Sequence, residues 1–375
     1  MRVDDGYRGI DANHDASWLR DSVCLANTVP GDLPGWPCNA LRPVRMSTRT
    51  FTSLSLSSEL APLCGLDAAN DAYCWDQGRY LALTPDSTTV GSVAWCGNTY
   101  CLFSPQKVRA GGPARQIVTP GPCILTMAGA VRCAGSNYYN QLSPTLNLGF
   151  SSDTLFTIAS PVTFTALAVA TLFQDFLCGL AGNGKAWCWG GNDAGQAGVG
   201  NYNARITAPT AVLTAQTFTA LAATNRAVCG LNTAGLAWCW GDGRAGELGW
   251  NGLGTSNVPV AVSGGHAFAS LVAGTTHFCG LEAGGAAWCW GYDQQGQLGA
   301  NQSGTCASTA AFSCSMVPIR VTGGLTFRQL AAGLGQTCGV TTTNQVYCWG
   351  MSDWGRLGQQ GFPTRAIGHP VQITP

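Results

Sequence analysis

Pairs of cysteines that stand ten positions apart recur six times along this chain of 375 residues. The repeated unit is clearest in the stretches CGLAGNGKAWCWG, CGLNTAGLAWCWG and CGLEAGGAAWCWG, and it returns every 50 to 59 residues. A period of that size indicates supersecondary units that stack on one another. The six pairs are Cys64 with Cys74, Cys123 with Cys133, Cys178 with Cys188, Cys229 with Cys239, Cys279 with Cys289 and Cys338 with Cys348.

Each pair predicts a β-hairpin closed by a disulfide. Turn-forming residues such as Asn183 lie between the cysteines, and alternating apolar residues lie outside them. If the turn of the third unit centres on Asn183, Cys178 falls opposite Cys188. Opposed Cα atoms at a non-hydrogen-bonded site lie about 4.5 Å apart, which is within the roughly 4.4–6.8 Å that a disulfide spans. The spacing therefore predicts a cross-strand bridge, with Trp187 and Trp189 on the face of the sheet away from the sulfurs.

Two further strands accompany each hairpin. An apolar strand lies upstream, as in FTALAVA from Phe164 and FTALAAT from Phe218, and a Pro-Val strand such as 258–262 comes before it. Four-stranded sheets that are apolar on both faces and repeat about every 50 residues close radially into a β-propeller. A solenoid is the alternative, but it requires capping ends that the sequence does not show.

The ends of the chain suggest the number of blades. The C-terminus finishes with a Pro-Val strand, HPVQITP, that no hairpin follows, and the N-terminal part holds a degenerate hairpin with Cys24 and Cys38 in the bridging positions. We therefore expect a single all-β domain over 1–375, a propeller of seven four-stranded blades whose last sheet joins 24–38 to 369–375. Residues 1–20 would form an N-terminal arm. Six blades plus such an arm is the alternative.

The remaining cysteines are also locally paired. Cys96 and Cys101 lie in one long insertion, and Cys306 and Cys314 in another, so all eighteen cysteines can form nine disulfides. Cysteine-rich zinc sites need closely set Cys-x-x-Cys or Cys/His clusters, which this sequence lacks, and we expect neither a metal nor a cofactor. Such disulfide density is typical of an oxidising compartment, and we expect an extracellular protein.

The charge balance excludes several classes of partner. The chain has 19 basic and 19 acidic residues, so it offers no electrostatic basis for binding nucleic acid or an anionic membrane. Charged residues make up 10% of the chain, against about a quarter in an average protein. We expect no membrane span, since no apolar run reaches about 18 residues. MRVDDGYRGI lacks the pattern of a signal peptide, so a secretion signal would have been removed or would belong to a longer precursor. Asn301 is a predicted glycosylation site.

The turns that follow the hairpins carry a family resemblance. GGNDAGQAG, GDGRAGELG, GYDQQGQLG and GMSDWGRLG follow the Trp-Cys-Trp-like segments and precede Pro-Val strands. This pattern resembles the repeats of the regulator of chromosome condensation family over residues 40–375. The paired cysteines are similar to those of its extracellular branch, which includes Crinkly-type plant receptor ectodomains, and the plan resembles that of secreted propellers that inhibit β-lactamases. The resemblance implies a β-propeller that serves as a scaffold for partners.

Apparent catalytic motifs have structural interpretations. The stretch 241–246 fits G-x-G-x-x-G but follows a hairpin strand and leads into no helix, so we interpret it as the repeat turn. His277 stands two residues before Cys279, where a hydrogen bond inside the blade is expected. Asp11, His14 and Asp15 cluster near the N-terminus and are expected to be solvated. We therefore predict a protein without enzymatic activity.

Residues that vary within the constant turn are candidates for binding. Aromatic residues and arginines are concentrated there, and these residue types dominate protein-binding surfaces. We expect a protein-binding scaffold that uses loops on one rim. The alternatives are a self-assembling structural subunit of an extracellular coat or filament, and a glycan-binding lectin. The candidate rim residues are Arg79, Tyr80, Tyr138, Tyr139, Tyr202, Arg244, Trp250, Tyr292 and Trp354.

Overall fold

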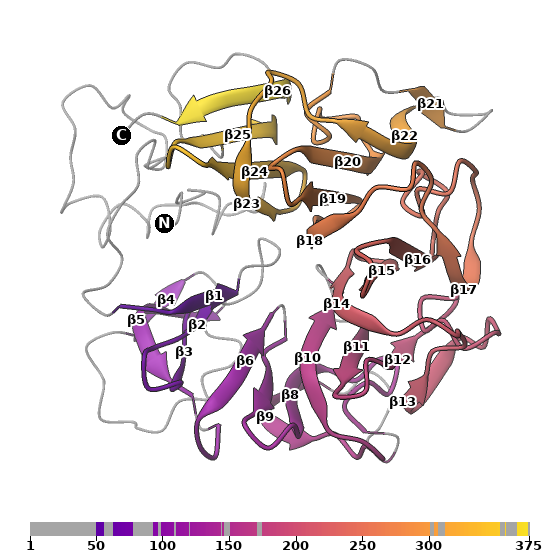
Figure 1. Cartoon of the computed structure of the whole chain (residues 1–375). Helices are drawn as coiled ribbons and strands as arrows, with labels where there is room; N and C mark the ends of the chain where they lie inside the picture. The colour runs from indigo at the N-terminus through magenta and orange to yellow at the C-terminus, as the bar shows by residue number, and fades with distance from the viewer. Residues whose placement is uncertain are drawn as a thin grey trace, which may run out of the picture.

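The computed structural model shows β-sheets arranged in a ring (Figure 1). It describes residues 50–55, 63–77, 93–96, 99–108, 110–119, 121–143, 145, 151–170, 175–300, 304–306, 312–352, 357 and 366–373. Within these ranges the chain forms six antiparallel sheets and no helix. Neighbouring first strands contact one another near the centre of the ring, as β10 contacts β6 and β14. Each sheet is therefore one blade of a β-propeller.

The six blades follow one another along the chain. The first contains β1 (Ser53–Ser55), β2 (Leu63–Leu66), β3 (Ala72–Gln77), β4 (Val93–Cys96) and β5 (Thr99–Lys107). The second contains β6 (Ala114–Val118), β7 (Cys123–Thr126), β8 (Val131–Ser136) and β9 (Ser151–Thr157). The third contains β10 (Phe164–Val169), β11 (Phe176–Ala181), β12 (Ala186–Gly191) and β13 (Arg205–Ala211).

The second half of the ring repeats this order. The fourth blade contains β14 (Phe218–Ala223), β15 (Ala227–Asn232), β16 (Ala237–Gly241) and β17 (Ser256–Ala261). The fifth contains β18 (Phe268–Ala273), β19 (His277–Glu282), β20 (Ala287–Tyr292), β21 (Gly304–Cys306) and β22 (Phe312–Arg320). The sixth contains β23 (Phe327–Ala332), β24 (Gln336–Thr341), β25 (Val346–Met351) and β26 (Ala366–Ile373).

The cysteine hairpin forms the middle of each blade. In the third blade Cys178 faces Cys188 across β11 and β12, in the register that the spacing predicts, and their Cα atoms lie 4.1 Å apart. The other five pairs with a separation of ten residues are bridged in the same way: Cys64 to Cys74, Cys123 to Cys133, Cys229 to Cys239, Cys279 to Cys289, and Cys338 to Cys348. Cys306 and Cys314 form a seventh bridge between β21 and β22.

Two further predicted pairs are not described at the level of their sulfurs. Cys96 lies in β4 and Cys101 in β5, which pair with each other, but their side chains are outside the described part of the structure. Cys24 and Cys38 also lie outside the described residues.

The prediction of seven blades is wrong. It treated the Pro-Val strand as the opening strand of the blade that follows it. In the structure this strand closes the blade whose hairpin precedes it, as β13 pairs with β12 and β17 pairs with β16. The C-terminal strand β26 accordingly pairs with β25 and completes the sixth sheet, with Val371 opposite Cys348. It is the fourth strand of its own blade, and the described sheets number six.

Close backbone approach explains the Gly that follows the first cysteine of the hairpin. A Cβ atom at Gly179 would lie 2.4 Å from the ring of Phe164, so only Gly leaves room for that ring. Phe164 in turn stacks on Trp189 with ring centroids 5.8 Å apart. The same residue types recur in the later blades, where Trp240, Trp290 and Trp349 are fully buried. The tryptophans that recur in phase are therefore core residues.

A turn after the third strand of one blade holds the core tryptophan of the next. The indole Nε1 of Trp240 donates a hydrogen bond to the carbonyl of Gln196 at 3.0 Å, and Gly198 lies against the same indole. Equivalent bonds join the second blade to the third, the fourth to the fifth and the fifth to the sixth. The turn thus fixes each blade to its neighbour.

One side chain in this turn also fixes the turn itself. Gln196 accepts a hydrogen bond from the backbone N–H of Ala194 at 2.8 Å, and Gln141 and Gln297 do the same in their blades. In the fourth blade the position is Glu247, which accepts from the N–H of Ala245 at 2.8 Å. Burial raises the pKa of Glu247 to about 8, so this carboxyl is mostly protonated at neutral pH.

We expect the bridges to resist reduction in the native protein. The cysteines of the first five ten-residue pairs expose at most 4% of their surface, and thiol–disulfide exchange requires the attacking thiolate to reach a sulfur. Dithiothreitol in native buffer should therefore leave most bridges intact, and added urea should accelerate their reduction. Each lost bridge should destabilise the fold by roughly 2–3 kcal/mol. Alkylation followed by mass spectrometry measures this, and a reduction rate independent of urea would contradict it.

Glu247→Gln should remove a pH dependence of stability. The carboxyl ionises near pH 4.5 when unfolded and near pH 8 when folded, so the free energy of unfolding falls as pH rises through that window, by up to about 1.4 kcal/mol per pH unit. The variant keeps an acceptor for Ala245 and has no charge to bury. The urea midpoint of the variant should exceed that of wild type by a margin that grows from pH 5 to pH 8. Parallel curves for wild type and Glu247→Gln would refute the assignment.

Candidate functional site

The turns after the third strands lie along one rim of the ring, which we call the turn rim. Each of these turns touches the loop between the first and second strands of the next blade, since Arg226 of the fourth blade bonds Asp193 of the third, and Gly335 of the sixth lies against Gln295 of the fifth. The opposite rim carries the tight turns of the cysteine hairpins, where Phe218 donates its backbone N–H to the carbonyl of Gly184. The variable positions of the repeat therefore share one edge of the molecule.

Ionic contacts gather on the turn rim between the third and fourth blades. Arg226 stands just before β15 and donates to Asp193 at 2.8 Å and to Asp242 at 3.2 Å. Arg244 donates from Nε to Asp242 Oδ1 at 2.9 Å and from Nη2 to Oδ2. Asp242 is 8% exposed, whereas Arg244 is 69% exposed. A buried carboxylate thus fixes two arginines, one of which faces solvent.

The pKa values follow from this network. Burial alone would raise the pKa of Asp242, but hydrogen bonds from Arg244 lower it below its usual range. The pKa of Asp193 is lowered in the same way, because hydrogen bonds from Arg226 and Gln196 outweigh burial. Asp175 precedes β11, and burial raises its pKa. Asp193 and Asp242 therefore remain ionised and hold the arginines in place at neutral pH.

Two tyrosines extend the ionic network onto the second blade. Tyr138 and Tyr139 meet edge to face with ring centroids 4.9 Å apart. Tyr139 packs against the backbone of Gly191, where an added Cβ would lie 3.4 Å from the ring, and burial raises the pKa of its hydroxyl. Tyr138 is 54% exposed. We call the combined surface the rim cluster; it consists of Tyr138, Tyr139, Asp175, Asp193, Arg226, Asp242 and Arg244.

The other candidate residues are placed differently. Tyr202 is exposed and its hydroxyl lies 3.4 Å from the carbonyl of Thr255. Trp250 packs against the core of the fourth and fifth blades, and its indole nitrogen is buried. Tyr292 packs on Phe312 and donates to Gln294. Trp250 is thus mainly a packing residue. Arg79, Tyr80, Trp354 and the predicted glycosylation site Asn301 lie outside the described residues.

Four of the seven residues of the rim cluster were not among the candidate rim residues: Asp175, Asp193, Arg226 and Asp242. Arg226 and Asp175 stand immediately before the first strand of their hairpins, at a position where the fifth and sixth blades carry Thr276 and Gly335. The variation at this position was a usable signal, because the end of one strand and the start of the next meet at the same rim. Asp242 was hidden in the segment that matches G-x-G-x-x-G.

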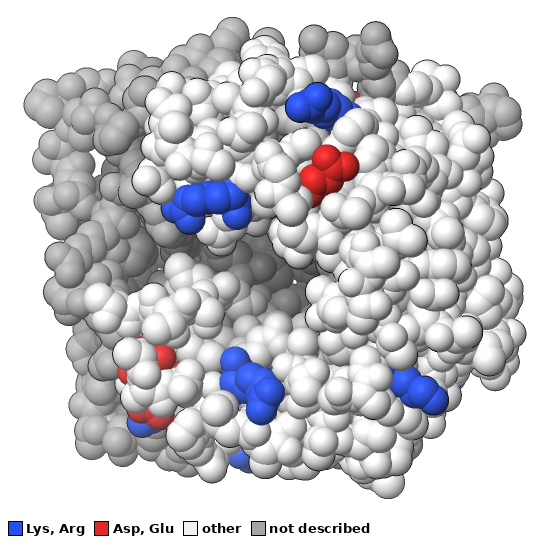
Figure 2. Space-filling view, viewed as in Figure 1, with Lys and Arg blue, Asp and Glu red and all other residues white. Residues whose placement is uncertain are grey.

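No group of three or more His, Cys, Asp or Glu in the described part of the chain is placed to hold a metal ion. A helix long and apolar enough to cross a membrane is also absent from that part. The face seen in Figure 2 carries few scattered charges and is hollowed at its centre. His277 lies in the interior and bonds Thr337 at 2.8 Å, from the next blade rather than its own.

Comparisons with known proteins place the fold. The crystal structure of human WBSCR16 matches with a TM-score of 0.69 and 18% identity, over 88% of this chain and 83% of that one. Yeast RCC1 (Prp20) bound to Kap60 matches with a TM-score of 0.70 and 18% identity, over 87% and 75%. The ectodomain of the Arabidopsis thaliana receptor kinase ACR4 has a TM-score of 0.47 and 19% identity, over 87% and 83%.

Sequence comparison identifies the repeat itself. No curated protein sequence matches the chain, but residues 327–359 match the model of the regulator of chromosome condensation (RCC1) repeat. This segment covers β23, β24 and β25 and the turn that follows them. The corresponding strands and bridged hairpin recur in the preceding blades. Residues 327–359 are therefore an RCC1 repeat, and the chain has the fold of the RCC1-like β-propellers.

Proposed function

We propose that this protein is a non-enzymatic propeller that binds a protein partner through the rim cluster. The observation that carries the proposal is that buried Asp242 fixes Arg226 and Arg244 on the rim that also bears exposed Tyr138. Arginine and tyrosine are enriched among the residues that dominate binding energy. Because the guanidinium groups are already ordered, a partner would bind them with a smaller loss of side-chain entropy.

The location on the repeat supports this proposal. In four described blades the turn has a buried Gln or Glu whose carbonyl accepts the indole N–H of the next blade's tryptophan. The equivalent outward position of these turns holds Tyr138, Asp193, Arg244 and Gln294 in successive blades. Because the turn keeps its structure whichever residue stands at this outward position, the residue there can be one that binds a partner. Yeast RCC1 (Prp20), which has a similar fold, was crystallised bound to another protein, Kap60.

We further propose that the protein works outside the cell. The seven described bridges include six that are internal to the hairpins of successive blades. Disulfides of this number persist in oxidising compartments and are rare in the cytosol. The partner would accordingly be a protein of the extracellular fluid or of a cell surface.

The double substitution Tyr138→Ala and Arg244→Ala should abolish partner capture while the protein remains folded at the temperature of the assay, because Arg226 still pairs with Asp242. Both side chains are mostly exposed, and loss of two hot-spot residues costs about 2 kcal/mol or more each. Quantitative affinity capture from the native extracellular fraction should show a protein that is enriched by wild type and depleted at least tenfold with the variant.

Matched controls lie on the opposite rim of the same two blades. Met127→Ala and Leu236→Ala remove exposed apolar side chains from the hairpin turns of the second and fourth blades, and both should capture the partner as wild type does. Equal capture by every variant would overturn the proposal. Depletion of the chain itself, with a lower oligomer mass, would instead indicate self-assembly, and depletion only of glycosylated material that free glycan displaces would indicate a lectin.

A further inference from the structure

The junction between the fifth and sixth blades is polar where the equivalent junctions are apolar. Phe176 lies opposite Gly190 in the third blade and clusters with Val228 of the fourth. Ala227 takes the same place in the fourth blade and clusters with Phe278 of the fifth. In the fifth blade the position is His277, opposite Gly291, and its contact in the sixth blade is Thr337.

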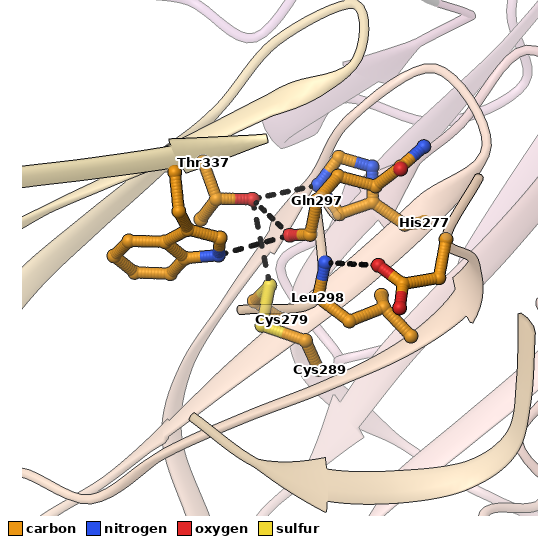
Figure 3. The surroundings of a disulfide bond; sticks show 8 residues. His277, Cys279, Cys289, Gln297, Leu298 and Thr337 are labelled. Atoms are coloured by element: carbon orange, nitrogen blue, oxygen red, sulfur yellow. Dashed lines mark hydrogen bonds between the residues drawn. A yellow bond between two sulfur atoms is a disulfide. The ribbon is translucent and has the colours of Figure 1, made fainter. Parts of the chain in front are cut away.

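The hydrogen bonds around His277 determine which of its ring nitrogens carries the hydrogen. Thr337 donates its hydroxyl hydrogen to the carbonyl of Gln297 at 2.9 Å, the same carbonyl that accepts the indole N–H of Trp349 at 3.0 Å. The hydroxyl can therefore only accept from His277, whose Nε2 lies 2.8 Å away and must carry the hydrogen. The disulfide of Cys279 lies beside this network, with Sγ 4.0 Å from the Thr337 hydroxyl (Figure 3).

The other nitrogen of His277 has no partner. Nδ1 is buried without a hydrogen bond, and the side chain has no exposed surface. It lies against Gly274, where an added Cβ would be 2.5 Å from Nδ1 and 2.5 Å from the carbonyl of Gly333. A proton added at Nδ1 would thus create a buried cation with an unpaired donor.

Charged groups on the surrounding elements do not compensate such a cation. β18, β20 and β24 carry no Asp, Glu, Lys or Arg, and the titratable Tyr292 ends β20. Asp293 in the adjoining turn accepts from the N–H of Leu298, Glu282 at the far end of β19 pairs with His266, and Arg328 on β23 is exposed. None of them affects the pKa of His277, which burial alone lowers to about 4.

We propose that the junction between the fifth and sixth blades is an acid-sensitive latch, in which protonation of His277 places an uncompensated charge between the two sheets and loosens them. Burial lowers the proton affinity of an imidazole, so the unfolded chain binds this proton at a higher pH than the folded chain does. Lowering the pH between the two pKa values therefore favours unfolding. The unfolded histidine titrates near 6.5 and the folded one near 4. Stability that is present above pH 6.5 is therefore lost progressively as pH falls toward 4.

The sixth-blade end of the latch is coupled to the core. The carbonyl of Gln297 joins Thr337 and Trp349, so a shift of His277 against Thr337 acts on the hydrogen bond that holds the sixth blade to the fifth. The fifth blade also bears the β21–β22 extension with its own disulfide. Mild acid should therefore loosen this part of the ring before the second, third and fourth blades.

Replacing His277 by Phe and Thr337 by Val tests the latch, because it reproduces the apolar pair Phe176 and Val228 of the earlier junction. Relative to this variant, the folding equilibrium constant of wild type should fall by up to tenfold per pH unit between pH 6.5 and 4. Urea unfolding at a series of pH values measures it. The control His369→Phe removes an exposed histidine of the sixth blade and should leave the wild-type slope unchanged. Parallel curves for wild type and the double variant would overturn the proposal.

Two measurements on these proteins localise the effect. In NMR spectra of wild type with labelled histidine, the Cε1–H signal that is absent from His277→Phe belongs to His277. Its chemical shift should stay that of a neutral imidazole down to about pH 5. A titration of this signal near pH 6.5 would overturn the proposal, even if the double variant failed to fold. Hydrogen exchange at pH 4.5, compared with the double variant at the same pH, should be faster in β19 and β24 and equal in β11 and β15. Uniformly faster exchange in all blades would contradict a local latch.

Discussion

The hydrogen bond from a core tryptophan to the turn of the preceding blade holds the ring together. Trp240 bonds the carbonyl of Gln196 while its ring packs on Phe218 of its own blade. One side chain therefore belongs to two sheets, and the position of one turn depends on the core of the next blade. Because an unpaired indole N–H is costly in the interior, this bond also fixes where the turn lies. The rim cluster depends on that placement, since Asp193, Asp242 and Arg244 come from two such turns.

Local structure was largely predictable from the sequence. The ten-residue spacing of Cys178 and Cys188 predicted both the hairpin and its register, because the residue numbers of opposed residues in an antiparallel pair add up to a constant. The propeller followed from the repeat period. The blade number was not predictable in the same way, since a Pro-Val strand can pair with either neighbouring hairpin. Only the backbone pairing of Val371 with Cys348 decides that β26 belongs to the sixth blade.

The candidate site was predictable only in part. The frame of the repeat directed attention to Tyr138, Tyr139 and Arg244, which do lie on one edge. Their partners come from a different segment, the start of the hairpin, and neither Arg226 nor Asp175 belongs to a recognisable motif. The sequence also does not distinguish an exposed aromatic residue from one that packs inward. Trp250 illustrates this, because a loop tryptophan can fold back onto the core.

Every described bridge joins a cysteine to the next cysteine along the chain. Each therefore needs only its own hairpin, and a ribosome or translocon that releases the chain from its N-terminus delivers the two partners together. Oxidation can then proceed blade by blade as the polypeptide emerges, with little need for an isomerase to correct long-range mispairing. The covalent pattern therefore allows each hairpin to be bridged before the blades that follow it along the chain have been made.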